Sequence, residues 1–202
     1  MTGKETTAEL NTVLNSHFLG FALINVATDG DNGNGPTWKF DVWNGRPLNP
    51  SFVKQLWDNW QGGAALKKEI ADNALTACVA KEYLAKPLSP TAENAGLVKW
   101  TSESKSGDQF ILLNGKHRIH TLKTYIIEPY KQYYNLVVKE LSKSSAANRA
   151  ASLQKVKEAE EELYSRGLWL VKLYDWGIYS SYLNSLLADC YFQIFKSMPL
   201  PL

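Results

Sequence analysis

The sequence contains only two cysteines, Cys78 and Cys190, among its 202 residues. Two cysteines cannot provide the disulfide framework on which small secreted domains depend, and both lie among apolar residues, as buried free thiols do. The scarcity of cysteine therefore predicts a protein of a reducing compartment, whose stability comes from a hydrophobic core.

The chain also lacks an excess of charge of either sign, because 22 basic and 20 acidic residues leave a formal net charge of +2. A nearly neutral chain has no general attraction for nucleic acid, and no helix-turn-helix segment is recognisable. Nucleic acid is therefore an unexpected partner.

Long apolar runs are missing as well. No stretch of about 18 apolar residues could cross a bilayer, and the first residues show no secretion signal. These absences lead us to expect an intracellular, cytoplasmic protein without membrane contact, with a nuclear location left open.

Apolar residues are nevertheless abundant: 45% of the chain is hydrophobic and 12% is aromatic, enough for one domain with a sizeable core. Short apolar or alternating runs predict strands at 21–27, 38–43, 75–80, 96–101, 109–113 and 168–174. Helical spacing of apolar residues predicts helices at 10–18, from a cap at Asn49 or Ser51 to Gly62-Gly63, from Lys116 to a kink or restart at Pro129, and at 130–141, 145–165 and 178–196. This mixture predicts a single α+β domain over residues 1–202.

Residues 108–124 hold the most informative motif. Phe110 to Leu113 is an apolar run suited to a buried strand, Asn114-Gly115 tolerates positive φ, and a helical apolar pattern follows from Ile119. Lys116 to Arg118 should then form the first helical turn, where the dipole favours an anion and each cation costs about 0.3–1 kcal/mol. A bound phosphate would offset that cost. An internal salt bridge and a solvated surface turn are the alternatives.

This motif resembles the strand–Gly-x-His-Arg–helix signature of the ParB/sulfiredoxin-like superfamily, which includes chromosome-partitioning nucleotide switches, sulfiredoxins and a free-serine kinase. Trp43 to Pro47 resembles the family's Asn-Pro-Arg turn, and Leu168 to Asp175 resembles the strand that closes its sheet. The resemblance covers about residues 20–190. It implies a small mixed β-sheet flanked by helices, with a core of about 20–125 and 167–196 and a helical hairpin inserted at about 128–166.

In that superfamily the phosphates of a nucleotide bind where the motif helix begins, and the motif His and Arg donate hydrogen bonds to them. The resemblance therefore implies a nucleotide or another phosphorylated small molecule as ligand, with Mg²⁺ and ATP, ADP or CTP as the expected cofactors. It assigns phosphate contacts to Asn114, Gly115, Lys116, His117, Arg118 and, in the upstream turn, Arg46.

The residues of the motif limit the reaction. Sulfiredoxin chemistry needs a nucleophilic cysteine between the motif Gly and His, and Lys116 occupies that position, which excludes this activity. Phosphoryl transfer needs a carboxylate to position the acceptor or metal, and the amide of Asn114 cannot act as a base. Asp41 is the first candidate for the missing acid, followed by Asp108 and Glu82. We expect at most weak phosphoryl transfer or nucleotide hydrolysis, and whether the protein is an enzyme stays open.

No structural metal site is predicted. His117 and His120 are three residues apart, and no third ligand follows at a recognisable spacing. The loop 28–36 alternates Asp29 and Asp31, but it lacks the bidentate Glu that completes a calcium loop.

Two other functions remain open. One is a non-catalytic protein-interaction module on the same fold, with helices 130–165 as the partner surface. The other is a DNA-binding or nuclease domain, an activity that some relatives in the superfamily show and that the near-neutral charge disfavours.

Overall fold

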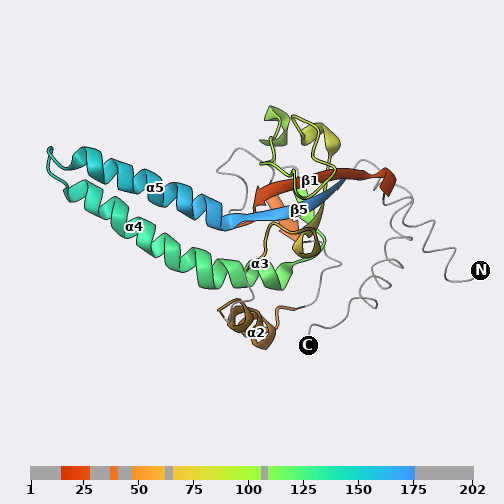
Figure 1. The fold of residues 1–202 in the computed structure, drawn as a ribbon, viewed down its shortest axis with the longest axis horizontal. Coiled ribbons are helices and arrows are strands. Elements are labelled where there is room, and N and C mark those ends of the chain that lie inside the picture. The colour runs from red at the N-terminus through yellow and green to blue at the C-terminus, as the bar shows by residue number, and fades with distance from the viewer. Residues whose placement is uncertain (1–14, 28–36, 41–46, 62–65, 106–108, 176–202) are drawn as a thin grey trace, which may run out of the picture.

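The computed structural model describes residues 15–27, 37–40, 47–61, 66–105 and 109–175. Five strands in these ranges form one sheet in the order β1-β5-β3-β4-β2 (Figure 1). The strands are β1 (Phe18–Asn25), β2 (Thr37–Phe40), β3 (Leu75–Val79), β4 (Gln109–Leu112) and β5 (Leu168–Asp175). β1 and β5 pair antiparallel, as do β3 and β4, whereas β3 pairs parallel with β5 and β2 with β4. The predicted α+β class with a small mixed sheet is confirmed.

The core lies along the inner strands of the sheet. β3 and β5 carry buried apolar residues at neighbouring positions, so both faces of these inner strands contribute to the core. Leu75, Val79, Val171 and Leu173 are fully buried, and Trp169 is 2% exposed. The core of the molecule therefore surrounds β3 and β5, the strands that Asn114 and Arg118 of the candidate site contact or approach.

Helix α2 (Pro50–Gln61) begins because Asn49 caps it. The Asn49 side-chain oxygen accepts hydrogen bonds from the backbone N–H groups of Ser51 at 3.0 Å and Phe52 at 3.3 Å. Such a cap satisfies two of the N–H groups that have no partner within the helix. Of the two caps predicted from the sequence, Asn49 is the one used.

A continuous helical segment follows β4. It consists of α3 (Lys116–Leu122), a π-helical turn η5 (Lys123–Ile127) and α4 (Glu128–Lys143). Pro129 lies near the beginning of α4, directly after the π turn, and the helical path continues through it without the restart that was one of the two predicted outcomes. The wider π turn immediately before it is a rare feature that occurs mostly as a single turn inside α-helices.

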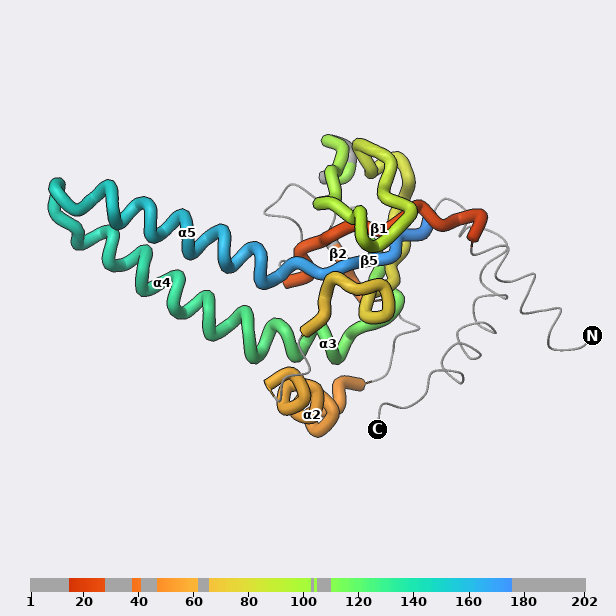
Figure 2. Tube along the Cα trace, in the orientation of Figure 1, coloured from red at the N-terminus to blue at the C-terminus, as the bar shows by residue number. Residues whose placement is uncertain are grey.

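Helix α5 (Arg149–Gly167) runs back along α4, and the two helices form a hairpin that projects from the body (Figures 1 and 2). The prediction of two antiparallel helices at 130–141 and 145–165, ended by Gly167, is confirmed. Val137 of α4 and Ala159 of α5 are buried in the hairpin, while Leu136 is 60% exposed. None of the described helices has the length and apolar character needed to span a membrane.

Two predictions of secondary structure were wrong. Residues 96–101 form no strand; they belong to an irregular segment with isolated bridges at Leu97 and Trp100. Phe18, expected in an opening helix, is the first residue of β1, because its ring packs against Phe21 at 5.2 Å and Tyr174 at 5.5 Å. The rest of that helix up to residue 14, the loop 28–36 and the predicted helix 178–196 lie outside the described residues.

Candidate functional site

The junction between β4 and α3 has the predicted form of a strand, a tight turn and a helix. β4 ends at Leu112, and Gly115 adopts a left-handed conformation with φ 85° and ψ 8°. The N–H group of Ile119 then donates to the Gly115 carbonyl at 2.9 Å and begins the helix. A side chain at position 115 would collide with the buried Leu75, so both the conformation and the space require glycine.

The Asn114 amide binds the neighbouring strand β3. Its Oδ1 accepts a hydrogen bond from the backbone N–H of Thr76 at 2.9 Å, and its Nδ2 donates to Thr76 Oγ1 at 3.0 Å. The backbone N–H of Leu113 also donates to the Thr76 carbonyl, at 2.8 Å. Asn114 therefore extends the pairing of β4 with β3 beyond the last strand residue.

His117 joins the start of α3 to the start of α2. Its Nε2 accepts a hydrogen bond from the backbone N–H of Asn49 at 3.0 Å, so this nitrogen carries no proton. The ring also meets Phe52 edge to face at 5.1 Å. The imidazole thus fixes the position of α2 beside the first turn of α3.

Arg118 turns in a different direction, toward the beginning of β3 and β5. Its Nη1 donates to the carbonyl oxygen of Asn73 at 2.8 Å, and the same oxygen accepts a hydrogen bond from Trp169 Nε1 at 2.9 Å. The guanidinium carbon lies 6.0 Å from the centre of the Trp169 ring. Asn73 is held in turn by its own side chain, which donates to the Lys67 carbonyl at 3.1 Å.

The electrostatics of Arg118 are unusual. Burial lowers the pKa of its guanidinium from the ordinary arginine value, although the side chain keeps part of its surface in contact with solvent. Within the described residues no carboxylate forms an ion pair with it. Desolvating a cation is unfavourable unless an opposite charge or several hydrogen bonds compensate it. Arg118 is therefore a partly desolvated cation without a charged partner in the described part of the protein.

A second partly buried cation, Lys68, was not identified from the sequence. Its Nζ donates to the Arg166 carbonyl at 2.7 Å, and its own carbonyl accepts a hydrogen bond from Leu170 N at 2.9 Å. Burial lowers the pKa of Lys68, opposed by the nearby Glu69 carboxylate. The local sequence Lys67-Lys68-Glu69 looks like an ordinary polar surface, so no sequence signal distinguished this residue.

The structure brings the motif residues into one turn but directs them to different neighbours. Asn114 contacts β3, His117 contacts α2, and Arg118 contacts the carbonyl that precedes β3, while Lys116 lies half-buried among them. Arg46 and the candidate acids Asp41 and Asp108 lie outside the described residues. Glu82 is exposed in the short helix η3 (Lys81–Tyr83), which follows β3 at the end opposite to Thr76.

An acidic residue of the described ranges is adjacent in sequence to the backbone carbonyl that Arg118 contacts. Asp72 directly precedes Asn73 and is exposed, and the sequence analysis did not select it. No three His, Cys, Asp or Glu side chains gather in the described ranges in a way that could hold a metal ion.

Comparison with known proteins supplies no family for this chain. No protein-family model, no curated protein and no solved structure matches it. Its function has to be inferred from the chemistry of the β4–α3 junction.

Proposed function

We propose that this protein binds a nucleotide or another phosphorylated small molecule at the β4–α3 junction, with Arg118 as the main phosphate contact. The observation that supports the proposal best is the desolvated guanidinium, which has no carboxylate partner among the described residues. A phosphate would provide the missing charge, and arginine can bind it through two parallel hydrogen bonds.

Two further features support the same ligand. Lys116 shares the first turn of α3, so a second cation is available next to Arg118. The resemblance of the motif to the ParB/sulfiredoxin-like signature supports a nucleotide over a simple anion.

The binding prediction is tested by the melting temperature in the presence of ATP, ADP, CTP or inorganic phosphate, with and without Mg²⁺. A ligand at about 100 times its Kd stabilises a protein by about 2.7 kcal/mol, which corresponds to a rise of about 5–10 °C for a chain of this size. We expect such a rise for at least one nucleotide. The absence of any rise with all four ligands would contradict the proposal.

Arg118→Met is the most informative variant, because methionine keeps much of the side-chain volume without the charge. If Arg118 serves a ligand, Arg118→Met should abolish the rise and leave the unliganded melting temperature unchanged or higher, since a costly buried cation is removed. A purely structural arginine would instead lower that temperature when replaced. Asn73 O keeps the hydrogen bond from Trp169 in the variant.

Two control variants separate this site from general effects. Lys123 lies with its Nζ 4.5 Å from the centre of the Trp38 ring, beyond the first turn, and Lys123→Ala should retain the response. Leu136→Glu, on the projecting hairpin, should retain it as well. Equal losses in Arg118→Met and Lys123→Ala would indicate diffuse electrostatics instead of a site.

Catalysis should be slow or absent, because Asn114 occupies the position where a carboxylate would be needed. General-base assistance is typically worth a factor of about 10²–10⁴ in rate. We expect phosphorus NMR of ATP, ADP and CTP with Mg²⁺ to show almost no turnover by the native protein. Asn114→Asp should still fold, since a carboxylate can accept hydrogen bonds from both Thr76 N and the Thr76 hydroxyl.

The increase in turnover rate of Asn114→Asp over the native protein should be near a factor of about 10², the low end of the range for general-base assistance. Two hydrogen bonds to the new carboxylate reduce its basicity. Turnover by the native protein that disappears in Arg118→Met would contradict the prediction. It would show that another acid acts, with Asp41 and Asp72 as the residues to replace next.

A second candidate function is protein binding through the α4–α5 hairpin. Tyr133, Leu136, Val138 and Leu153 are large apolar residues exposed on it, which is typical of contact surfaces. The Leu136→Glu variant described above would abolish such binding while leaving the nucleotide response intact. No observation on the described residues favours the DNA-binding or nuclease alternative.

A further inference from the structure

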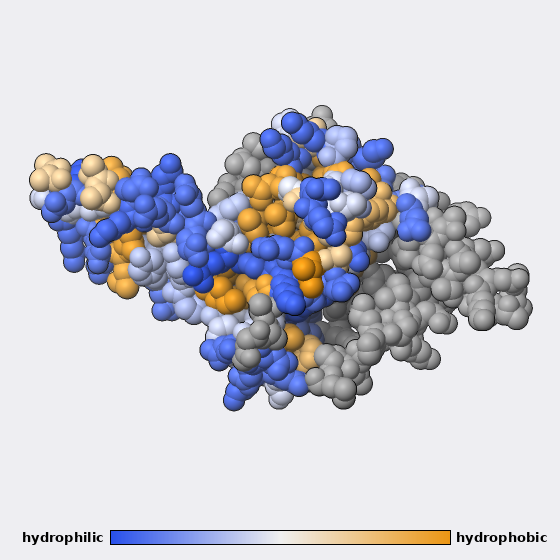
Figure 3. Space-filling view, viewed as in Figure 1, coloured by the Kyte–Doolittle hydropathy of each residue, from blue (hydrophilic) through white to orange (hydrophobic). Residues whose placement is uncertain are grey.

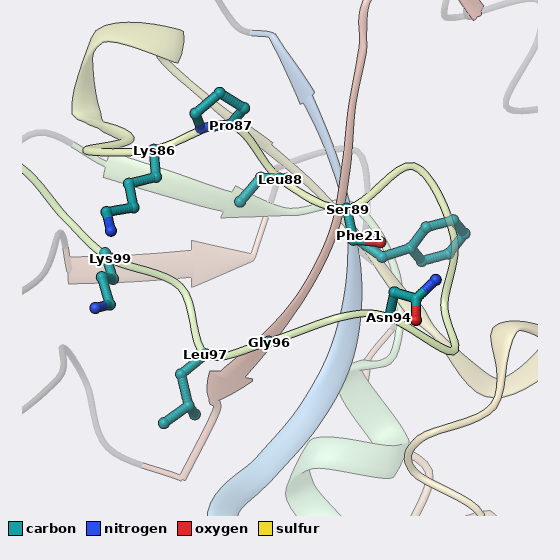
Figure 4. A pocket seen from close by; sticks show the side chains of 9 residues that line it. All are labelled: Phe21, Lys86, Pro87, Leu88, Ser89, Asn94, Gly96, Leu97 and Lys99. Carbon is teal, nitrogen blue, oxygen red and sulfur yellow. The ribbon is translucent and has the colours of Figure 1, made fainter.

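A separate cavity lies beside the edge strand β1, away from the β4–α3 junction. It has a volume of about 190 Å³ and is formed between β1 and the segment 84–101, which runs over this edge strand (Figure 4). β5 and β3 separate β1 from β4 in the sheet. The cavity is therefore distinct from the proposed phosphate site.

Backbone hydrogen bonds fix the walls of this cavity. Phe21 N donates to Ser89 O at 2.7 Å, Leu23 N to Gly96 O at 2.9 Å, and Val98 N to Leu23 O at 3.2 Å. Gly20 permits the close approach, because it has φ 131° and a side chain there would collide with Leu88 and the Ser89 carbonyl. The cavity is preformed, and the edge of β1 beneath it is already hydrogen-bonded.

The lining combines apolar surface with two lysines. Leu97 is 53% exposed, and Leu88 and Phe21, which also line the cavity, are half-buried. Figure 4 shows Lys86 and Lys99 side by side, with their ammonium groups pointing in the same direction, and Asn94 with the Phe21 ring at the other side. Neither lysine forms an ion pair with a described residue.

Residues around the cavity add to its positive charge and apolar surface. A third ammonium group, that of Lys172, lies 5.8 Å from the centre of the Phe21 ring. Glu93, which precedes Asn94 in the chain, is exposed and forms no ion pair with any described residue, so it does not neutralise Lys86 or Lys99 in that way. On the face shown in Figure 3, apolar residues gather on the body around this segment, whereas the hairpin is mainly hydrophilic.

The size of the cavity limits its ligand. Pockets for drug-sized ligands measure about 300–1,000 Å³, so a space of about 190 Å³ is too small for a whole nucleotide. One apolar side chain fits it, with an anionic group outside on the lysines. Because the edge of β1 is occupied, the ligand cannot bind as an additional strand, and its side chains must be recognised instead.

We infer that this cavity binds a short peptide segment of a partner protein in which acidic and aliphatic residues alternate. An aliphatic side chain of the segment lies in the cavity over Leu97, and a neighbouring carboxylate lies between Lys86 and Lys99. Charge complementarity selects the acidic peptide, and the apolar floor selects its aliphatic residue.

The test is a titration of the ¹⁵N-labelled full chain with the blocked peptide acetyl-Glu-Leu-Asp-Leu-amide, followed by amide chemical shifts. We expect weak binding with shifts confined to residues 86–99 and the adjoining part of β1. The double variant Lys86→Glu/Lys99→Glu should weaken binding at least about tenfold, and Leu97→Ser should also weaken it. Replacement of both acidic residues of the peptide by lysine, or of both leucines by serine, should abolish the shifts.

The matched control is Lys139→Glu/Lys155→Glu, which makes the same charge change at two exposed positions of the hairpin. This variant should bind like the native protein. Equal weakening in the two double variants, shifts located elsewhere, or no shifts at several millimolar peptide would each overturn the inference. All the replaced side chains are exposed, so the melting temperatures of the variants should confirm that they remain folded.

Discussion

Replacing Gly115 by alanine should destabilise the protein by about 2–5 kcal/mol. A left-handed conformation costs a non-glycine residue about 1–2 kcal/mol, and forcing extra volume into a packed core costs about 1–3 kcal/mol more. Both terms apply, because Gly115 has φ 85° and its missing side chain would collide with the fully buried Leu75. Urea unfolding followed by circular dichroism measures the loss.

A control variant and a double variant separate the backbone strain at Gly115 from the collision with Leu75. Gly96→Ala is the matched control: no atom lies within 4 Å of the added carbon, so the change should stay within about 0.5 kcal/mol. In a Leu75→Ala background, Gly115→Ala should cost only the conformational part, about 1–2 kcal/mol. A cost of Gly115→Ala as small as that of Gly96→Ala would show that the turn does not have the described geometry.

Trp169→Ala should destabilise the protein by about 3–5 kcal/mol, the usual cost of removing a large aromatic side chain from a core. Trp169 is 2% exposed, packs near Trp60 at 6.3 Å between ring centres, and donates to the Asn73 carbonyl. Trp169→Phe should cost less, about 1–2 kcal/mol, because it retains most of the burial and loses the hydrogen bond. Trp57, half-buried and stacked on Tyr125, provides a control whose replacement by alanine should cost less than that of Trp169.

The same carbonyl connects this prediction to Arg118. Asn73 O accepts hydrogen bonds from both Trp169 Nε1 and Arg118 Nη1, so either single variant leaves it one donor. The double variant Trp169→Phe/Arg118→Met leaves none, and its cost should exceed the sum of the two by about 1–3 kcal/mol. Simple additivity would mean that water replaces the lost donors.

Local sequence determined several elements of this protein. An apolar run, Asn114-Gly115 and a helical apolar pattern follow each other directly, so the strand, turn and helix at 109–122 could be predicted from neighbouring residues. Asn49 as a helix cap and the end of α5 at Gly167 are local in the same sense. These signals succeed because they depend on backbone dihedral preferences and hydrogen bonds within one turn.

Tertiary contacts decided where local patterns were ambiguous. Residues 96–101 alternate like a strand, but their backbone groups bind the edge of β1 through irregular bonds and not a ladder. Phe18 fits a helical period, yet it lies in β1 because β5, more than 140 residues later in the chain, provides its partner. Strand order and register depend on such pairings, which no local window contains.

The candidate site also has a part that the local sequence determines and a part that only the tertiary structure decides. Its position at the start of α3 follows from the sequence, because the turn and the helix are local. The directions of its side chains do not, since Asn114 binds Thr76, 38 residues away, His117 binds Asn49, 68 residues away, and Arg118 binds Asn73, 45 residues away. The desolvation of Arg118 likewise arises only when α3 packs against the starts of β3 and β5, because burial depends on which distant segments surround a side chain.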